Sequence, residues 1–157
     1  MRTHFRLTHA AILLIALAAV AAAAQPNFSG TWKLNLAKST FGEMPAPSSI
    51  VATIKHEEPN FQMAVQQSSD MGDMNYDVKY TTDGKECTNT IFDGPTVGVV
   101  KWDGEALTVA TKGKFGDSDF TMNDRITLSE DGKVMTVLRH FSSGFGEGDQ
   151  KMVFEKQ

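Results

Sequence analysis

The chain has 157 residues, with 15 Lys and Arg against 19 Asp and Glu, 41% hydrophobic residues and a single Cys. This length is typical of one domain, and the hydrophobic fraction excludes a disordered chain. A net charge of −4 provides no basic surface for nucleic acid, and one Cys excludes both an internal disulfide and a Cys-rich zinc site.

Residues 1–24 have the pattern of a secretory signal peptide. Arg2 and Arg6 precede a short apolar run, and Ala22 and Ala24 are the small residues expected before a cleavage site ahead of Gln25. The apolar run is marginal for a membrane span, which needs about 20 residues; a retained anchor is the alternative. We therefore expect residues 25–157 to be a periplasmic or secreted domain, with no membrane span after cleavage.

From residue 25 onward, apolar and polar residues alternate with the period of a β-strand. The turn signals are three Asp-Gly pairs (Asp83-Gly84, Asp103-Gly104 and Asp131-Gly132) and Glu58-Pro59-Asn60. Strands at this spacing predict an all-β sandwich or barrel. The predicted strands, about ten in number, are 28–36, 50–57, 60–67, 74–82, 85–92, 97–102, 105–112, 119–129, 134–142 and 149–156.

The turns also predict which residues face each other, because side chains alternate between the two faces of a sheet. A turn at Asp131-Gly132 places Asp124 opposite Arg139, on a face that is otherwise apolar. The other expected inward pairs are Tyr80–Cys87, Val78–Asn89, Tyr76–Ile91, Ile54–Met63, Ala52–Val65 and His56–Phe61. Every hairpin thus has one apolar face.

A long up-and-down ladder with one apolar face avoids exposed edges by closing on itself. We therefore predict a single antiparallel β-barrel. A barrel of roughly ten strands is wide enough to enclose a ligand cavity.

The opening of the predicted domain resembles the calycin superfamily, which includes lipocalins and fatty-acid-binding proteins. The resemblance rests on Gly30-Thr31-Trp32 in the first strand and on Lys101-Trp102-Asp103-Gly104, which is similar to a late hairpin of the fatty-acid-binding branch. It implies that Trp32 is a structural residue that closes one barrel end. The segments 30–35, 83–89 and 139–141 also resemble small exported bacterial lipocalin-like proteins.

Two features of that branch are missing from this sequence. Fatty-acid-binding proteins carry a helical lid after their first strand, but residues 37–49 contain two Pro and a Gly, so we predict no helical lid. Their last strand also carries an Arg-x-Tyr carboxylate site, whereas residues 151–157 contain neither Arg nor Tyr. That site is therefore not transferred to this chain.

Polar residues on the inner face are the candidate ligand-binding groups. Asp124 and Arg139 would either neutralise each other as an internal pair or orient the polar end of a ligand. Tyr76, Tyr80 and Asn89 would hydrogen-bond a ligand or water, although Tyr is also a common strand residue.

The longer links collect at one end of the predicted barrel and carry aromatic residues. Phe41, Phe115 and Phe145 would form either an apolar rim around the cavity entrance or plugs that fold inward. An envelope protein that docks on this rim is the predicted alternative partner.

No catalytic site, cofactor site or metal site is indicated. His56 and His140 lack metal-ligand spacing, and the chain has no nucleophile elbow or phosphate loop. The leading hypothesis is a non-enzymatic protein that binds or carries a small lipophilic molecule in its barrel. The alternatives are an envelope interaction module and, third, an enzyme.

Overall fold

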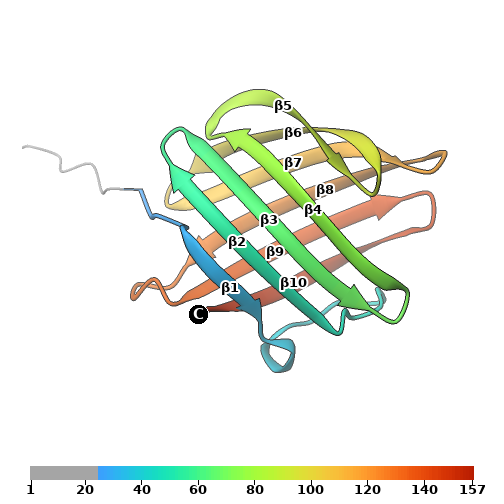
Figure 1. Ribbon diagram of the computed structural model, residues 1–157, viewed down its shortest axis with the longest axis horizontal. Helices are drawn as coiled ribbons and strands as arrows, with labels where there is room; N and C mark the ends of the chain where they lie inside the picture. The colour runs from blue at the N-terminus through green and yellow to red at the C-terminus, as the bar shows by residue number, and fades with distance from the viewer. Residues whose placement is uncertain (1–24) are drawn as a thin grey trace, which may run out of the picture.

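The computed structural model describes residues 25–157, so the predicted signal peptide at 1–24 lies outside the described residues. The described chain is all-β apart from one 3-10 turn, η1 (Leu36–Lys38), in the link after the first strand (Figure 1). Its strands are β1 (Gly30–Leu34), β2 (Ser49–Glu57), β3 (Asn60–Ser69), β4 (Gly72–Thr81), β5 (Asp83–Ile91), β6 (Gly94–Asp103), β7 (Ala106–Phe115), β8 (Ser118–Leu128), β9 (Val134–Ser143) and β10 (Gly146–Lys156).

These strands form one sheet that curls into a nearly closed barrel. The order across the ten-stranded sheet is β4-β3-β2-β1-β10-β9-β8-β7-β6-β5, so β1 joins β10 and connects the beginning of the described chain to its end. In Figure 1 the strands β1–β4 lie in front and cross the strands behind them at a steep angle. The predicted all-β, up-and-down barrel of about ten strands without a helical lid is confirmed.

The predicted registers are confirmed in two hairpins. Asp124 pairs with Arg139 across β8 and β9, and Ile54 pairs with Met63 across β2 and β3. The strict two-residue alternation of side chains makes both registers depend only on the position of the turn. In the β6–β7 hairpin the central turn residues are Gly104 and Glu105, because Asp103 pairs with Ala106.

The predicted pairing of β4 with β5 is wrong. The two strands are the edges of the sheet and share no ladder. The gap is instead bridged by the Asn89 side chain, whose Oδ1 accepts from Lys79 N at 2.7 Å and whose Nδ2 donates to Lys79 O at 3.1 Å. On the inner side Tyr80 lies directly over Gly98 of β6, where a Cβ would collide with its ring. The barrel therefore closes through side chains at this seam.

The barrel end at the β2–β3, β4–β5 and β6–β7 links is filled by aromatic side chains. Phe28, Trp32 and Phe61 have no exposed surface, and Trp32 Nε1 donates to the Phe28 carbonyl oxygen at 2.9 Å. Lys156 Nζ lies 5.2 Å from the centre of the Trp32 ring, in cation–π range. Phe28, Trp32 and Phe61, called the aromatic plug below, thus close one end of the barrel, and the cavity opens toward the other end. Within residues 25–157, none of the helical segments has the length and apolar character needed to cross a bilayer.

Candidate functional site

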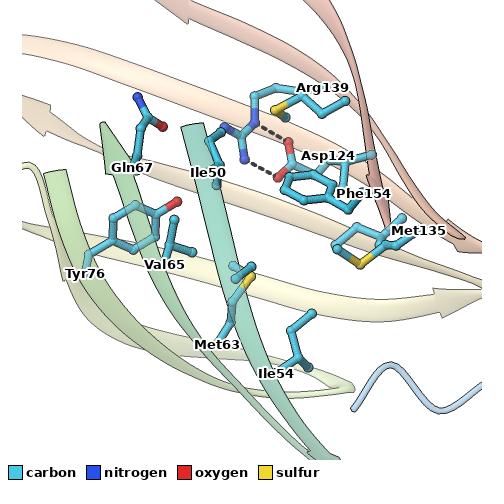
Figure 2. Close-up of a pocket in the computed structure, with 14 residues that line it drawn as sticks. Ile50, Ile54, Met63, Val65, Gln67, Tyr76, Asp124, Met135, Arg139 and Phe154 are labelled. Atoms are coloured by element: carbon cyan, nitrogen blue, oxygen red, sulfur yellow. Dashed lines mark hydrogen bonds and ion pairs between the residues drawn. The ribbon is translucent and has the colours of Figure 1, made fainter. Parts of the chain in front are cut away.

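A cavity of about 50 Å³ lies inside the barrel between strands β2–β4 and β8–β10. Most of its lining is apolar, from residues such as Ile50, Ile54 and Met135. Figure 2 shows that its polar groups come from opposite sides of the barrel. They are Gln67, Tyr76, Asp124 and Arg139. An apolar chamber with few polar groups is the usual composition of a small-molecule site.

Asp124 and Arg139 form a two-point ion pair in this cavity (Figure 2). Arg139 Nε donates to Asp124 Oδ1 at 2.8 Å, and Arg139 Nη2 donates to Asp124 Oδ2 at 2.7 Å. The side chains keep 21% and 11% of their surface exposed, for Arg139 and Asp124 respectively. Burial alone lowers the pKa of Arg139, but the Asp124 carboxylate outweighs it and raises that pKa above the ordinary value. Arg139 is therefore a permanent cation held by its partner.

Tyr76 lies across the cavity from this pair. Burial is the main cause that raises the pKa of the Tyr76 hydroxyl, and the positive charge of Arg139 opposes it. The hydroxyl thus stays protonated at neutral pH and serves as a neutral donor and acceptor. Gln67 adds a second neutral polar group. Its place in the cavity was not predicted, although Gln67 lies two residues beyond Val65 on the same face of β3.

A larger vestibule of about 340 Å³ lies beside the inner cavity, at the barrel end opposite the aromatic plug. Four residues line both spaces, so the two are neighbours across them: Ile50, Gln67, Arg139 and Met152. The Pro-rich link after η1 contributes Phe41 and Met44 to the vestibule wall. The volume falls within the range of about 300–1,000 Å³ that is usual for ligand pockets.

An aromatic row leads from the solvent to the vestibule. Phe145 is 78% exposed and Phe115 is 50% exposed, with their ring centres 6.2 Å apart. The ring centre of Phe115 lies 5.3 Å from that of Phe92, and the ring centre of Phe92 lies 5.2 Å from that of the buried Phe120. Phe41 and Phe115 line the vestibule, whereas Phe145 stands outside it. The rim is therefore part wall and part exposed surface.

Two of the predicted ligand-binding residues lie away from the cavity wall. Asn89 is on the inner side of β5, but its amide is occupied by the Lys79 backbone across the seam. Tyr80 is 5% exposed and fills the space over Gly98. Burial raises the pKa of Tyr80 above its ordinary value, and a hydrogen bond with Thr111 opposes this shift. Tyr76, Asp124 and Arg139 are thus brought together, and Tyr80 and Asn89 are used to close the barrel.

A polar cluster at the plugged end was not predicted. His56 is only 3% exposed; its Nδ1 accepts from Phe28 N at 3.3 Å, so its Nε2 carries the proton that is donated to Glu58 Oε1 at 2.8 Å. Glu58 also accepts from Trp102 Nε1 at 2.9 Å and from Thr82 Oγ1. Burial raises the pKa of Glu58, but these hydrogen bonds together bring it below the ordinary value. The inward position of His56 opposite Phe61 was the available signal.

Comparisons with known proteins agree with the fold. No family model matches the chain, and no curated protein matches it. Human cRBP IV has a TM-score of 0.55 at 17% identity, covering 84% of this chain and 99% of that chain. Zebrafish ileal bile acid-binding protein, solved with cholic acid, has a TM-score of 0.55 at 18% identity, covering 83% and 98%. A Schistosoma mansoni fatty acid binding protein, solved with arachidonic acid, has a TM-score of 0.50 at 13% identity, covering 83% and 96%.

At sequence identities of 13–18%, the similarity to these three structures shows the fold alone. The chain has the barrel architecture of the fatty-acid-binding proteins, which is the calycin-type fold that the Gly30-Thr31-Trp32 segment and the strand pattern predict.

Proposed function

We propose that this protein binds or carries a small lipophilic molecule inside its barrel, without catalysing a reaction. The observation that carries the proposal is the apolar inner cavity, with its few polar groups, beside a vestibule of about 340 Å³. Similar barrels have been solved with cholic acid and with arachidonic acid, which supports a lipophilic ligand. The signal-peptide pattern of residues 1–24 supports export, and we propose a periplasmic or secreted bacterial protein.

The test is binding of the neutral fluorescent dye Nile red to the purified protein, together with organic extraction of co-purified lipids. Gln67 lines both spaces, whereas its neighbour Gln66 is exposed on the outer face of β3. Gln67→Phe should weaken dye binding about tenfold or more by filling the region between the two spaces, and Gln66→Phe should leave it unchanged. A wild-type protein that binds no dye and yields no lipid would overturn the proposal.

The exposed aromatic rim supports a second candidate function, docking on an envelope protein. Phe145 is 78% exposed and Phe115 is 50% exposed, and their ring centres lie 6.2 Å apart, so they form a contiguous exposed apolar surface of the kind that marks interaction sites. Phe145→Ser should then abolish cross-linking to the partner in intact cells while Nile red binding persists. Loss of both properties together would instead place Phe145 in the ligand entrance.

A further inference from the structure

The charges that line the ligand space almost cancel. The inner cavity contains Asp124 and Arg139, and the vestibule adds Asp73. Among the described residues that line either space, Arg139 is the only Lys or Arg. Its two-point contact with Asp124, at 2.8 and 2.7 Å, is the geometry in which a guanidinium and a carboxylate satisfy each other most fully. A ligand therefore meets no unpaired positive charge.

A ligand carboxylate would be poorly accommodated at this pair. To reach Arg139 it would have to share the guanidinium with Asp124 or displace it, and Asp124 is only 11% exposed. Two carboxylates beside one guanidinium leave an uncompensated negative charge in a largely apolar space, which is unfavourable. Asp73 at the vestibule adds to the repulsion. The site therefore opposes anions.

An uncharged polar group would be well accommodated. Arg139 has five N–H donors, and two of them are directed to Asp124. Tyr76 and Gln67 present a hydroxyl and an amide to the same space (Figure 2). A ligand hydroxyl, ketone or ester oxygen can accept from these donors without breaking the Asp124–Arg139 pair. No charge has to be buried for that contact to form.

Building on the proposed function, we propose that the site selects uncharged lipophiles that carry a single alcohol, ketone or ester group. Asp124 excludes carboxylates that have the same chain length as these uncharged ligands. Asp124 acts as a specificity-determining residue because it occupies the one cation that a carboxylate would need.

The experiment measures displacement of Nile red from the full-length protein by 1-dodecanol and by dodecanoate at pH 8, where the acid is ionised. The wild type should require at least about ten times more dodecanoate than dodecanol. Equal or stronger binding of dodecanoate would overturn the selectivity. If Nile red itself fails to bind, the proposed function fails, so the two outcomes are distinguishable.

Asp124→Asn separates the protein's selectivity from the different water solubility of the two ligands. This variant leaves Arg139 as an uncompensated cation, so the ratio of the two affinities should shift about tenfold or more toward dodecanoate. Asp77→Asn makes the same charge change at an exposed position on β4 and should leave the ratio unchanged. An unchanged ratio in a folded Asp124→Asn variant would overturn the proposal.

If Asp124→Asn does not fold, the double variant Asp124→Asn/Arg139→Gln provides the measurement. It replaces the ion pair with two neutral amides and leaves the net charge of the site unchanged, so the preference for dodecanol should persist. A double variant that binds dodecanoate better than dodecanol would contradict the role of charge balance.

Discussion

Asp124 and Arg139 are individually unfavourable inside a barrel and stable only as a pair. Asp124→Ala leaves Arg139, whose side chain is 21% exposed, without its carboxylate partner. We expect the free energy of unfolding to fall by about 3 kcal/mol, the lower end of the range for breaking a buried pair because Arg139 keeps some contact with solvent. Urea denaturation followed by Trp fluorescence measures the change.

Asp77→Ala, at an exposed position on β4, is the matched control for that experiment and should change stability by less than about 0.5 kcal/mol. An equally small change for Asp124→Ala would mean that water, rather than Arg139, solvates the carboxylate.

The ion pair was predictable from sequence because its geometry depends on one turn and on side-chain alternation. Once the turn at 131–132 is recognised, Asp124 and Arg139 must lie opposite each other on the apolar face. Gln67 follows from the same logic on β3. The role of Asn89 does not, because its amide reaches sideways to the Lys79 backbone, and alternation describes only the face on which a side chain lies.

The Asn89 side chain bridges the seam between β4 and β5. The Asn89 amide replaces a pair of ladder hydrogen bonds by binding both Lys79 N and Lys79 O. Asn89→Ala should cost about 1–2 kcal/mol and should open the seam locally. Hydrogen exchange should show faster exchange of the Lys79 amide, while amides in the β8–β9 ladder keep their protection.

Thr90→Ala, on the exposed side of the same strand, should leave the Lys79 exchange rate unchanged. If Asn89→Ala leaves it unchanged as well, water or neighbouring backbone closes the seam without the amide.

Sequence patterns predict the individual strands well and the seam poorly, for a physical reason. Asp83-Gly84 has the composition of a hairpin turn, but whether the two strands continue to pair depends on distant packing. Tyr80 occupies the inner side of the seam over Gly98 of β6, and a register shift falls between Asp83 and Glu86. These contacts involve a third strand, so turn chemistry alone does not reveal them.

At the scale of the whole molecule, the two barrel ends differ in their chemistry. The end at the β2–β3, β4–β5 and β6–β7 links is filled by Phe28, Trp32 and Phe61, and Glu58 connects these links by hydrogen bonds. The opposite end has the long link 35–48, exposed Phe145 and the vestibule. The sequence predicts longer links at the vestibule end, and this is wrong for four of the five: residues 70–71, 92–93, 116–117 and 144–145 are two-residue links, because the strands extend further than predicted, and only the link 35–48 is long. The plugged end, called the base here, is closed, and the vestibule lies at the other end. This arrangement suits a barrel that a ligand enters from one side.

Glu58 makes the stability of that base dependent on pH. It connects the β2–β3 turn to Thr82, in the link between β4 and β5, and to Trp102 on β6, so it holds the plugged end across the seam. Despite the opposing effect of burial, hydrogen bonds from Thr82, His56 and Trp102 lower its pKa below the ordinary value of 4.5. The ionised form is thus favoured by folding, and its contribution is present above about pH 4.5 and lost as the pH falls through the lowered pKa.

Glu58→Gln should therefore reduce the free energy of unfolding by about 1 kcal/mol at pH 7, a modest value because the Glu58 side chain is 44% exposed. At acid pH the variant and the wild type should converge, because protonated Glu58 has already lost its charge-assisted bonds. Thermal unfolding followed by circular dichroism between pH 7 and pH 3 measures both effects. Glu57→Gln, at the exposed neighbouring position, should run parallel to the wild type across this range. A constant difference between Glu58→Gln and the wild type at every pH would show that geometry, and not the charge of Glu58, holds the base together.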